Sequence, residues 1–234
     1  MIDEFLNPTN PKEAVSFKQK YPNALYLSGG TWINSSYSKL NPKTVISLAG
    51  LGLNKVEKKS DVLEIGSFVT MQDLIDNKDI PEVLKESARH VGSRNIRNMA
   101  TLGGSIGAKS PWFSLSPALL VLETILTVHD GEKEKDVLLS EYIEKDYNDL
   151  ILKLKISSKT KRTAKVLKYT RTARTVPVIV ASASYEKEGN NYINPLVAIG
   201  GVSNKTVLLK NLSLTNKREE IEKTISSLVN PKGD

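Results

Sequence analysis

The stretch of sequence that decides the fold is Ile96-Arg97-Asn98-Met99-Ala100-Thr101-Leu102-Gly103-Gly104-Ser105-Ile106. It lies within residues 92–116, a segment rich in Gly, Ser and Asn that also contains several large apolar residues. Large apolar side chains such as Met99 and Leu102 are not expected in a loop that is exposed to solvent. We therefore expect this segment to wrap around another group.

A second Gly-Gly pair occurs earlier, where the apolar run over residues 24–27 leads into Ser28-Gly29-Gly30-Thr31. Consecutive glycines after a strand can adopt φ > 0 and bring backbone amides close to a ligand. Such amides form anion-binding concavities, so two loops on opposite sides could hold one diphosphate. The alternative is that both pairs are ordinary tight turns. Neither loop matches G-x-G-x-x-G or the P-loop, so a Rossmann or nucleoside-triphosphate site is not supported.

The composition excludes several classes of site. The 234 residues are 39% hydrophobic and 25% charged, as in an ordinary globular protein. They include no cysteine, which excludes disulfides, cysteine nucleophiles and thiolate ligation of zinc or iron–sulfur clusters by this chain. His90 and His129 lack metal-site spacing and are expected to be structural or surface residues. Without a leader-like N-terminus or a membrane-length apolar run, the protein is expected to be soluble and cytoplasmic.

The order of the predicted elements indicates a mixed α and β protein. Asn10, Pro11 and Glu13 form the pattern of a helix start, and this helix should end near Pro22. Strands are expected at residues 24–27, 44–48, 62–65, 124–128, 150–156, 166–169, 178–185, 192–199 and 206–209. Further helices are expected from Thr70, over residues 81–91, over residues 118–122 with Ser116 as the cap, and from Asn216.

Three segments, in order and at similar spacing, resemble the FAD-binding subunits of the xanthine dehydrogenase and carbon monoxide dehydrogenase family. Leu27 to Thr31 is similar to the first flavin loop, [LV]-A-G-G-T. Leu63 to Ser67, followed by Thr70, resembles L-x-I-G-A-x-x-T. Ile96 to Ile106 resembles I-R-N-x-x-T-[IL]-G-G-[NS]-I. The resemblance extends over most of the chain.

This resemblance implies an α+β fold with two domains: a two-lobed FAD-binding domain of the PCMH type over residues 1–158, and a small sheet-and-helix domain over residues 159–234. It implies FAD as the cofactor. It also implies two partners, a large molybdenum-cofactor subunit and a small 2Fe-2S subunit, from which electrons pass through FAD to an acceptor. We expect no catalytic side chain and no metal ligand in this chain, because the cofactor carries the chemistry.

Carried over residue by residue, the resemblance also implies the contacts of FAD. The loops that hold the diphosphate and adenosine portion, chiefly through backbone amides, are Leu27, Ser28, Gly29, Gly30, Thr31, Trp32 and Ile33, and Ala100, Thr101, Leu102, Gly103, Gly104 and Ser105. Ser114 occupies the position of an aspartate that hydrogen-bonds the ribityl chain. Leu150 and Ile151 resemble the aliphatic residues that pack on the isoalloxazine ring, and Lys168 resembles a lysine near the flavin.

The sequence departs from the family pattern at five positions. Ser114 brings no charge where the family has aspartate, and Lys109 differs from the pattern. Trp112 and Phe113 replace Ala-like positions, and Val176 stands where some relatives have an aromatic residue over the ring. An alternative is therefore a structural subunit of the same complex that has lost FAD.

A basic run leaves a further alternative. The net charge is +7, and Lys159, Lys161, Arg162, Lys165, Lys168, Arg171 and Arg174 follow one another without an acidic residue. Such a run can be a solvated basic face, a surface toward a partner or the flavin, or a nucleic-acid-binding module. Nucleic acid binding calls for interleaved aromatic platforms or a known module, which this sequence lacks, so no nucleic acid is expected.

Overall fold

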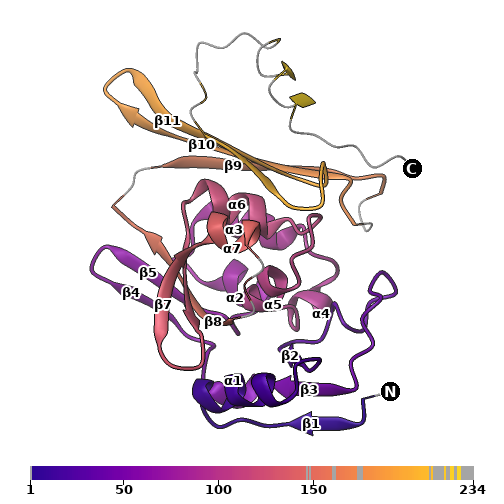
Figure 1. Ribbon diagram of the computed structural model, residues 1–234. Helices are drawn as coiled ribbons and strands as arrows, with labels where there is room; N and C mark the ends of the chain where they lie inside the picture. Colours follow the sequence, from indigo (N-terminus) through magenta and orange to yellow (C-terminus); the bar gives the residue numbers. More distant parts are fainter. Residues whose placement is uncertain are drawn as a thin grey trace.

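The computed structural model describes residues 2–145, 147, 149–159, 162–172, 176–210, 212, 219, 222–223 and 226–227. Figure 1 shows an N-terminal lobe at the bottom, a middle layer of helices beside a larger sheet, and a second large sheet at the top. This arrangement confirms the predicted α+β class. Among the described residues, no helix is long and apolar enough to cross a membrane.

The N-terminal lobe is a parallel three-stranded sheet with one helix. Its strands β1 (Glu4–Leu6), β3 (Thr44–Ser47) and β2 (Leu25–Leu27) lie in the order β1-β3-β2. Helix α1 (Pro11–Lys20) begins as predicted, because the Asn10 side chain accepts a hydrogen bond of 2.9 Å from the amide of Glu13. Ala14 and Val15 are its buried residues.

The middle layer contains an antiparallel five-stranded sheet in the order β4-β5-β8-β6-β7. Its strands are β4 (Val56–Lys59), β5 (Val62–Gly66), β8 (Leu150–Ser157), β6 (Ile125–His129) and β7 (Glu134–Leu138). The central strand β8 serves two hydrophobic cores. Leu150 and Leu152 pack into the core of the N-terminal lobe, whereas Ile151 and Leu154 pack into the larger core of the middle layer. Strand β8 therefore fixes the position of one lobe against the other.

Short helices fill the middle layer. They are α2 (Met71–Asp76), α3 (Glu82–Arg89), α4 (Arg94–Arg97), α5 (Leu102–Gly107), α6 (Leu115–Val121) and α7 (Leu139–Glu144). The short helix η1 (Ala49–Leu51) belongs instead to the N-terminal lobe, because Leu51 packs against the core of that lobe. Thr70 and Asp73 form the predicted capping box of α2. The predicted start of the helix after residue 116 was wrong. Helix α6 begins at Leu115, with Ser114 at the cap position, and every residue of α6 is buried, so packing rather than a side-chain cap sets its start.

The upper sheet is antiparallel and packs on α6. Its strands β9 (Thr163–Tyr169), β10 (Ile179–Glu188), β11 (Asn191–Gly200) and β12 (Val207–Leu209) lie in the order β12-β11-β10-β9. Val166, Val180 and Ala198 join the core of the middle layer. The helix predicted from Asn216 lies outside the described residues, and the division between residues 158 and 159 stays a prediction.

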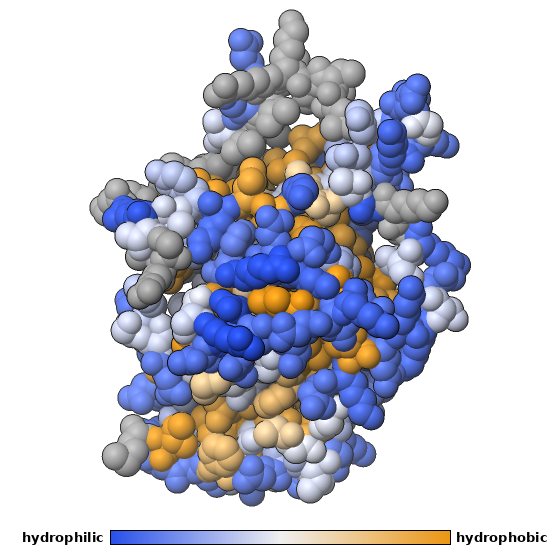
Figure 2. Space-filling model, turned by 180° about the vertical axis from the view of Figure 1, so that it is seen from behind, coloured by the Kyte–Doolittle hydropathy of each residue, from blue (hydrophilic) through white to orange (hydrophobic). Residues whose placement is uncertain are grey.

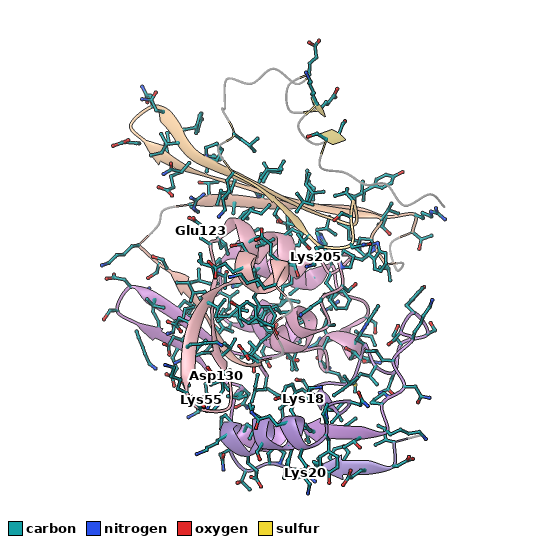
Figure 3. All side chains as sticks on the ribbon, viewed as in Figure 1. Lys18, Lys20, Lys55, Glu123, Asp130 and Lys205 are labelled. Carbon is teal, nitrogen blue, oxygen red and sulfur yellow. The ribbon has the colours of Figure 1, made fainter. Side chains whose placement is uncertain are left out.

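Polar contacts join the upper sheet to the helices. The Arg162 guanidinium lies 2.9 Å from the carboxylate of Glu123 and 3.0 Å from that of Glu186, with its side chain only 6% exposed. The ammonium of Lys205 donates to the carbonyl oxygen of Glu144 at 2.7 Å. Glu123 and Lys205 both lie between the helices and the upper sheet (Figure 3). The back of the molecule is largely hydrophilic, with small hydrophobic areas between the polar residues (Figure 2).

Candidate cofactor-binding site

A cavity of about 480 Å³ lies where the N-terminal lobe meets the middle layer. Its walls come from the end of β2 and the loop after it, from the start of α5, from α7, and from the start of β8. Val176 and Pro177, which precede β10 of the upper sheet, also belong to the lining. Segments far apart in the sequence therefore build a single pocket of ligand size.

The two Gly-Gly loops touch each other at this cavity. A Cβ atom at Gly29 would overlap the carbonyl oxygen of Met99, so the backbones approach too closely for any side chain. Gly30 has φ +67°, in the left-handed region that favours glycine. We name residues 28–33 the first loop and residues 99–105 the second loop. Their glycines are required by backbone geometry, as the sequence indicated.

The second loop packs against residues 63–70, the segment that resembles L-x-I-G-A-x-x-T. The amide of Leu102 donates to the carbonyl oxygen of Val69 at 2.9 Å, and that of Gly103 donates to Ser67 at 2.7 Å. Thr70 and Thr101 form a β-bridge. A Cβ at Gly103 would lie 2.6 Å from the Cβ of Ser67. The role of residues 63–70 is thus to support the second loop from below.

Hydrogen bonding distinguishes the two loops. In the second loop the amides of Leu102 and Gly103 are bonded as above, the Gly104 amide donates to Thr101 Oγ1 at 3.1 Å, and the Ser105 amide donates to the Thr101 carbonyl at 3.0 Å. By contrast, none of the amides of residues 29–33 donates to an acceptor among the described residues. Among the described residues, the amides of residues 102–105 are thus already bonded within the protein, whereas those of residues 29–33 remain available to a ligand. The prediction that both loops hold the cofactor stays a prediction.

Most of the predicted site residues line the cavity. They are Ser28, Gly29, Gly30, Thr31, Trp32, Ile33, Ala100, Thr101, Gly103, Gly104, Ser105, Ser114, Leu150 and Ile151. Leu27, Leu102 and Lys168 do not belong to the lining. Leu102 is fully buried in the core. The ammonium of Lys168 donates to the carbonyl oxygen of His90 at 3.3 Å, and His90 does line the cavity.

The five residues that depart from the family pattern all line the cavity. Trp32 of the first loop meets Phe113 edge to face, with ring centroids 5.2 Å apart. Ser114 is 4% exposed, and its hydroxyl makes no capping bond to α6. Lys109, Trp112 and Val176 also line the cavity. The aromatic pair thus closes the space between the first loop and the segment after α5.

A polar aromatic end of the cavity was not predicted. The rings of Tyr142 and Tyr147 stack with centroids 5.6 Å apart, and both residues line the cavity together with Tyr26 and Asp149. Burial, with a smaller effect of Asp149, raises the pKa of Tyr142 to about 12. The same two causes raise the pKa of Tyr26. No spacing in the sequence connects these residues, since they come from β2, α7 and the approach to β8.

Two small residues of the lining were also missed. Gly107 and Ala108, at the end of α5, line the cavity. A Cβ at Gly107 would meet no atom within 4 Å, so protein packing does not require glycine there. Because glycine weakens a helix relative to alanine, its presence suits a position where open space must be kept. A signal existed in the sequence, namely a third glycine just after the Gly-Gly pair.

The cavity also has basic groups on its lining. Lys18 extends from the side of α1 that faces the middle layer, whereas Lys20 lies on the opposite side (Figure 3). The Lys18 ammonium donates to the carbonyl oxygens of Pro22 and Ala24 at 2.6 and 2.7 Å, and burial lowers its pKa. In the described part of the chain, no group of three or more His, Asp or Glu side chains is arranged to hold a metal ion.

Comparisons with known proteins show which family this chain is similar to. Residues 2–157 match the model of the FAD binding domain in molybdopterin dehydrogenase. An uncharacterized protein of Escherichia coli K12, YgfM, is 27% identical over all of this chain and 88% of its own length. Xanthine dehydrogenase/oxidase of Gallus gallus is 26% identical over 64% of this chain and 12% of its own length.

A solved structure has the same fold. A chain of carbon monoxide dehydrogenase from Hydrogenophaga pseudoflava aligns with a TM-score of 0.88 at 16% identity, covering all of this chain and 89% of its own. That similarity confirms the predicted fold, and the family match confirms the resemblance read from the three segments. The match spans both glycine loops and the β-strand segment beneath them. The chain therefore belongs to the family of FAD-binding domains found in molybdopterin dehydrogenases.

Proposed function

We propose that this chain is the electron-transfer subunit of a molybdenum hydroxylase-type complex, holding FAD in the cavity between the two loops. The observation that carries the proposal is the row of unbonded amides at residues 29–33 beside a cavity of about 480 Å³. Amides without a protein acceptor, next to a glycine with φ > 0, suit the oxygens of a diphosphate. FAD, when bound, supplies the redox chemistry.

The residues of the cavity fit this cofactor. The hydroxyls of Ser28, Thr31 and Ser105 have no hydrogen-bond partner among the described residues. Together with the amides of the first loop, they can donate hydrogen bonds to the cofactor. Gly107 leaves open space beside the end of α5, because a Cβ there would meet no atom within 4 Å, so a flat group can lie close to the helix. Among the described residues, the lining has two ammonium groups, those of Lys18 and Lys109, and one carboxylate, that of Asp149. A cofactor with a negative diphosphate matches this balance.

Each part of the cofactor has residues suited to it. The first loop would hold the diphosphate, and the second loop would hold the first in place through the Gly29 contact. The buried Ser114 would face the ribityl chain with one hydroxyl. Leu150 and Ile151 would pack against the ring, and Lys168 would support the wall at His90. The Trp32–Phe113 pair would exclude water from the enclosed part.

The proposed partners supply the metal centres that this chain has no side chains to ligate. With no cysteine, it cannot ligate an iron–sulfur cluster through thiolates. We propose that a small 2Fe-2S subunit delivers electrons and that a large molybdenum-cofactor subunit oxidises the substrate. Substrate identity then belongs to the large subunit, and the electron acceptor is external. A cytoplasmic location stays a prediction from the sequence.

The basic run gives little support to a nucleic-acid-binding function. The Lys159 ammonium lies 2.8 Å from the carboxylate of Asp61, and Arg162 is buried between Glu123 and Glu186. Lys168 turns inward toward His90. Lys161 and Arg174 lie outside the described residues. Several of these cations are therefore engaged within the fold and do not form one exposed basic face.

Reconstitution with FAD tests the proposal. We expect the purified protein, incubated with FAD and passed over a desalting column, to retain the visible absorption of bound flavin. Gly107→Leu, which fills open space, should weaken FAD binding at least about tenfold without lowering the melting temperature of the apo protein. The control Gly50→Leu places the same side chain at an exposed glycine outside the cavity and should bind like the parent. A parent protein that never retains FAD would favour the structural subunit instead.

A further inference from the structure

The loop between β2 and β3 carries two large apolar side chains at the mouth of the cavity. Residues 34–40 are Asn-Ser-Ser-Tyr-Ser-Lys-Leu, so Tyr37 and Leu40 stand among small or polar residues. Both line the cavity, yet the Tyr37 side chain is 67% exposed and that of Leu40 is 44% exposed. A residue that faces a cavity and is also open to solvent lies at its mouth. The loop extends from the N-terminal lobe toward the middle layer (Figure 1).

Three other large apolar residues of the lining are exposed as well. Ile96 comes from α4, Trp112 from the segment after α5, and Val176 from the segment before β10. Exposed apolar side chains gathered around one opening indicate a surface that is covered in the functional state. The mouth of the cavity is therefore suited to closing over a ligand.

Both ends of this loop are fixed to the rest of the protein. At the start, the amide of Asn34 donates to the carbonyl oxygen of Gly30 at 3.1 Å, which ties the loop to the first loop. At the far end, Pro42 is buried, and the carbonyl oxygen of Lys43 accepts a hydrogen bond of 2.8 Å from the amide of Asp3. The stretch between these ends has two firm attachments.

Between the ends, the loop is bonded only to itself. In the described part of the chain, the hydrogen bonds of residues 35–40 join positions two or three apart, such as the 3.0 Å bond from the Ser38 amide to the Ser35 carbonyl oxygen. None of residues 34–40 is fully buried. Segments without long-range bonds or buried side chains move at the lowest cost in free energy. Residues 34–40 can therefore change position while both ends stay in place.

We propose that residues 34–40, which we name the flap, close over the bound cofactor and that Tyr37 is the side chain that covers it. The flap follows the first loop directly, so it starts beside the amides proposed to hold the diphosphate. Bound FAD would offer the Tyr37 ring a surface to lie against, which removes apolar area from water. Closure of this kind retains a ligand and excludes solvent. This inference rests on the proposed function.

The rate of FAD release from the isolated chain tests the flap. The variants are Tyr37→Ser, Tyr37→Phe and a control, Tyr192→Ser, because Tyr192 is 55% exposed and lies outside the lining. Association and dissociation of FAD are followed by flavin fluorescence. In Tyr37→Ser, we expect release about tenfold faster, with the association rate changed less than about twofold. Tyr37→Phe should restore slow release, and Tyr192→Ser should match the parent. The apo proteins should melt alike, because both tyrosines are exposed.

Trypsin cleavage after Lys39 measures closure itself. Lys39 is an exposed residue of the flap. Saturating FAD should slow cleavage of the Lys39–Leu40 bond at least about tenfold in the parent, because the open form becomes rare. Cleavage of the Lys59–Ser60 bond, in the turn between β4 and β5 and outside the lining, should not change. Tyr37→Ser should lose most of the protection at the same FAD occupancy.

The possible outcomes separate this inference from the proposed function. If the parent binds FAD but Tyr37→Ser releases it no faster than Tyr192→Ser, the inference is overturned, and the exposed rim is left for a partner subunit to cover. Cleavage after Lys39 that FAD does not slow would overturn it as well. If the parent binds no FAD, the proposed function fails, and the inference fails with it.

Discussion

Both glycine loops contain a Gly-Gly pair followed by a residue with a hydroxyl group, yet the amides of the two loops are bonded differently. In the second loop, the amides of residues 102–105 are all bonded to protein acceptors, and Gly103 is packed against Ser67. In the first loop, the amides of residues 29–33 have no acceptor among the described residues. The comparison teaches that a Gly-Gly pair can serve either as a scaffold or as a binding surface. The bonds of its amides decide which.

The contact between the loops should be the most sensitive point. In Gly29→Ala the new Cβ overlaps the carbonyl of Met99, so the loops must separate. We expect the free energy of unfolding to fall by about 3 kcal/mol, as in overpacked interiors, and FAD binding to be lost. Urea unfolding of the apo protein measures the first effect. In the control Gly50→Ala the nearest atom is the Pro8 carbonyl oxygen at an ordinary 3.6 Å, so its stability should match the parent. A Gly29→Ala protein as stable as that control would show that the loops need not touch.

A substitution inside the second loop should lower the free energy of unfolding more than it lowers the free energy of FAD binding. In Gly103→Ala the Cβ would lie 2.6 Å from the Cβ of Ser67 and 2.9 Å from its carbonyl oxygen. We expect a loss of about 2 kcal/mol in unfolding free energy. The loss of FAD binding free energy, measured well below the melting temperature, should be smaller than that. If binding falls more than stability does, the second loop contacts the cofactor directly and the division between the loops is wrong.

Removing one threonine hydroxyl from each loop should give the smallest effects, with a loss of stability in one variant and a loss of FAD affinity in the other. Thr101 Oγ1 caps α5, so Thr101→Ala should cost about 1 kcal/mol of stability and change FAD affinity little. Thr31 has no bonded partner among the described residues, so Thr31→Ala should leave stability within about 0.5 kcal/mol of the parent. Its FAD affinity should instead fall about fivefold, because the hydroxyl would no longer donate one hydrogen bond to the cofactor. The reverse assignment of the two effects would contradict the comparison.

The sequence predicted the class, most strands and both loops, because local signals determine them. The Asn10 cap, the Thr70 capping box and the glycines after β2 each act over a few residues. What it could not predict depends on contacts between distant segments. The bonding of the second loop depends on Ser67 and Val69, and the start of α6 depends on burial over its whole length.

The polar aromatic end of the cavity shows the same limit. Tyr26, Tyr142 and Asp149 are brought together by β8, which joins the two cores, and no periodicity relates them.

Amide resonances of the apo protein, followed by NMR during titration with FAD, test the division between the loops most directly. We predict that the amides of residues 29–33 exchange rapidly with solvent in the apo protein and become protected, with large shifts, when FAD binds. The amides of Gly103 and Gly104, already bonded to Ser67 and Thr101, should be protected from the start and shift little. New protection at residues 102–105, with none at residues 29–33, would contradict the assignment of the diphosphate to the first loop.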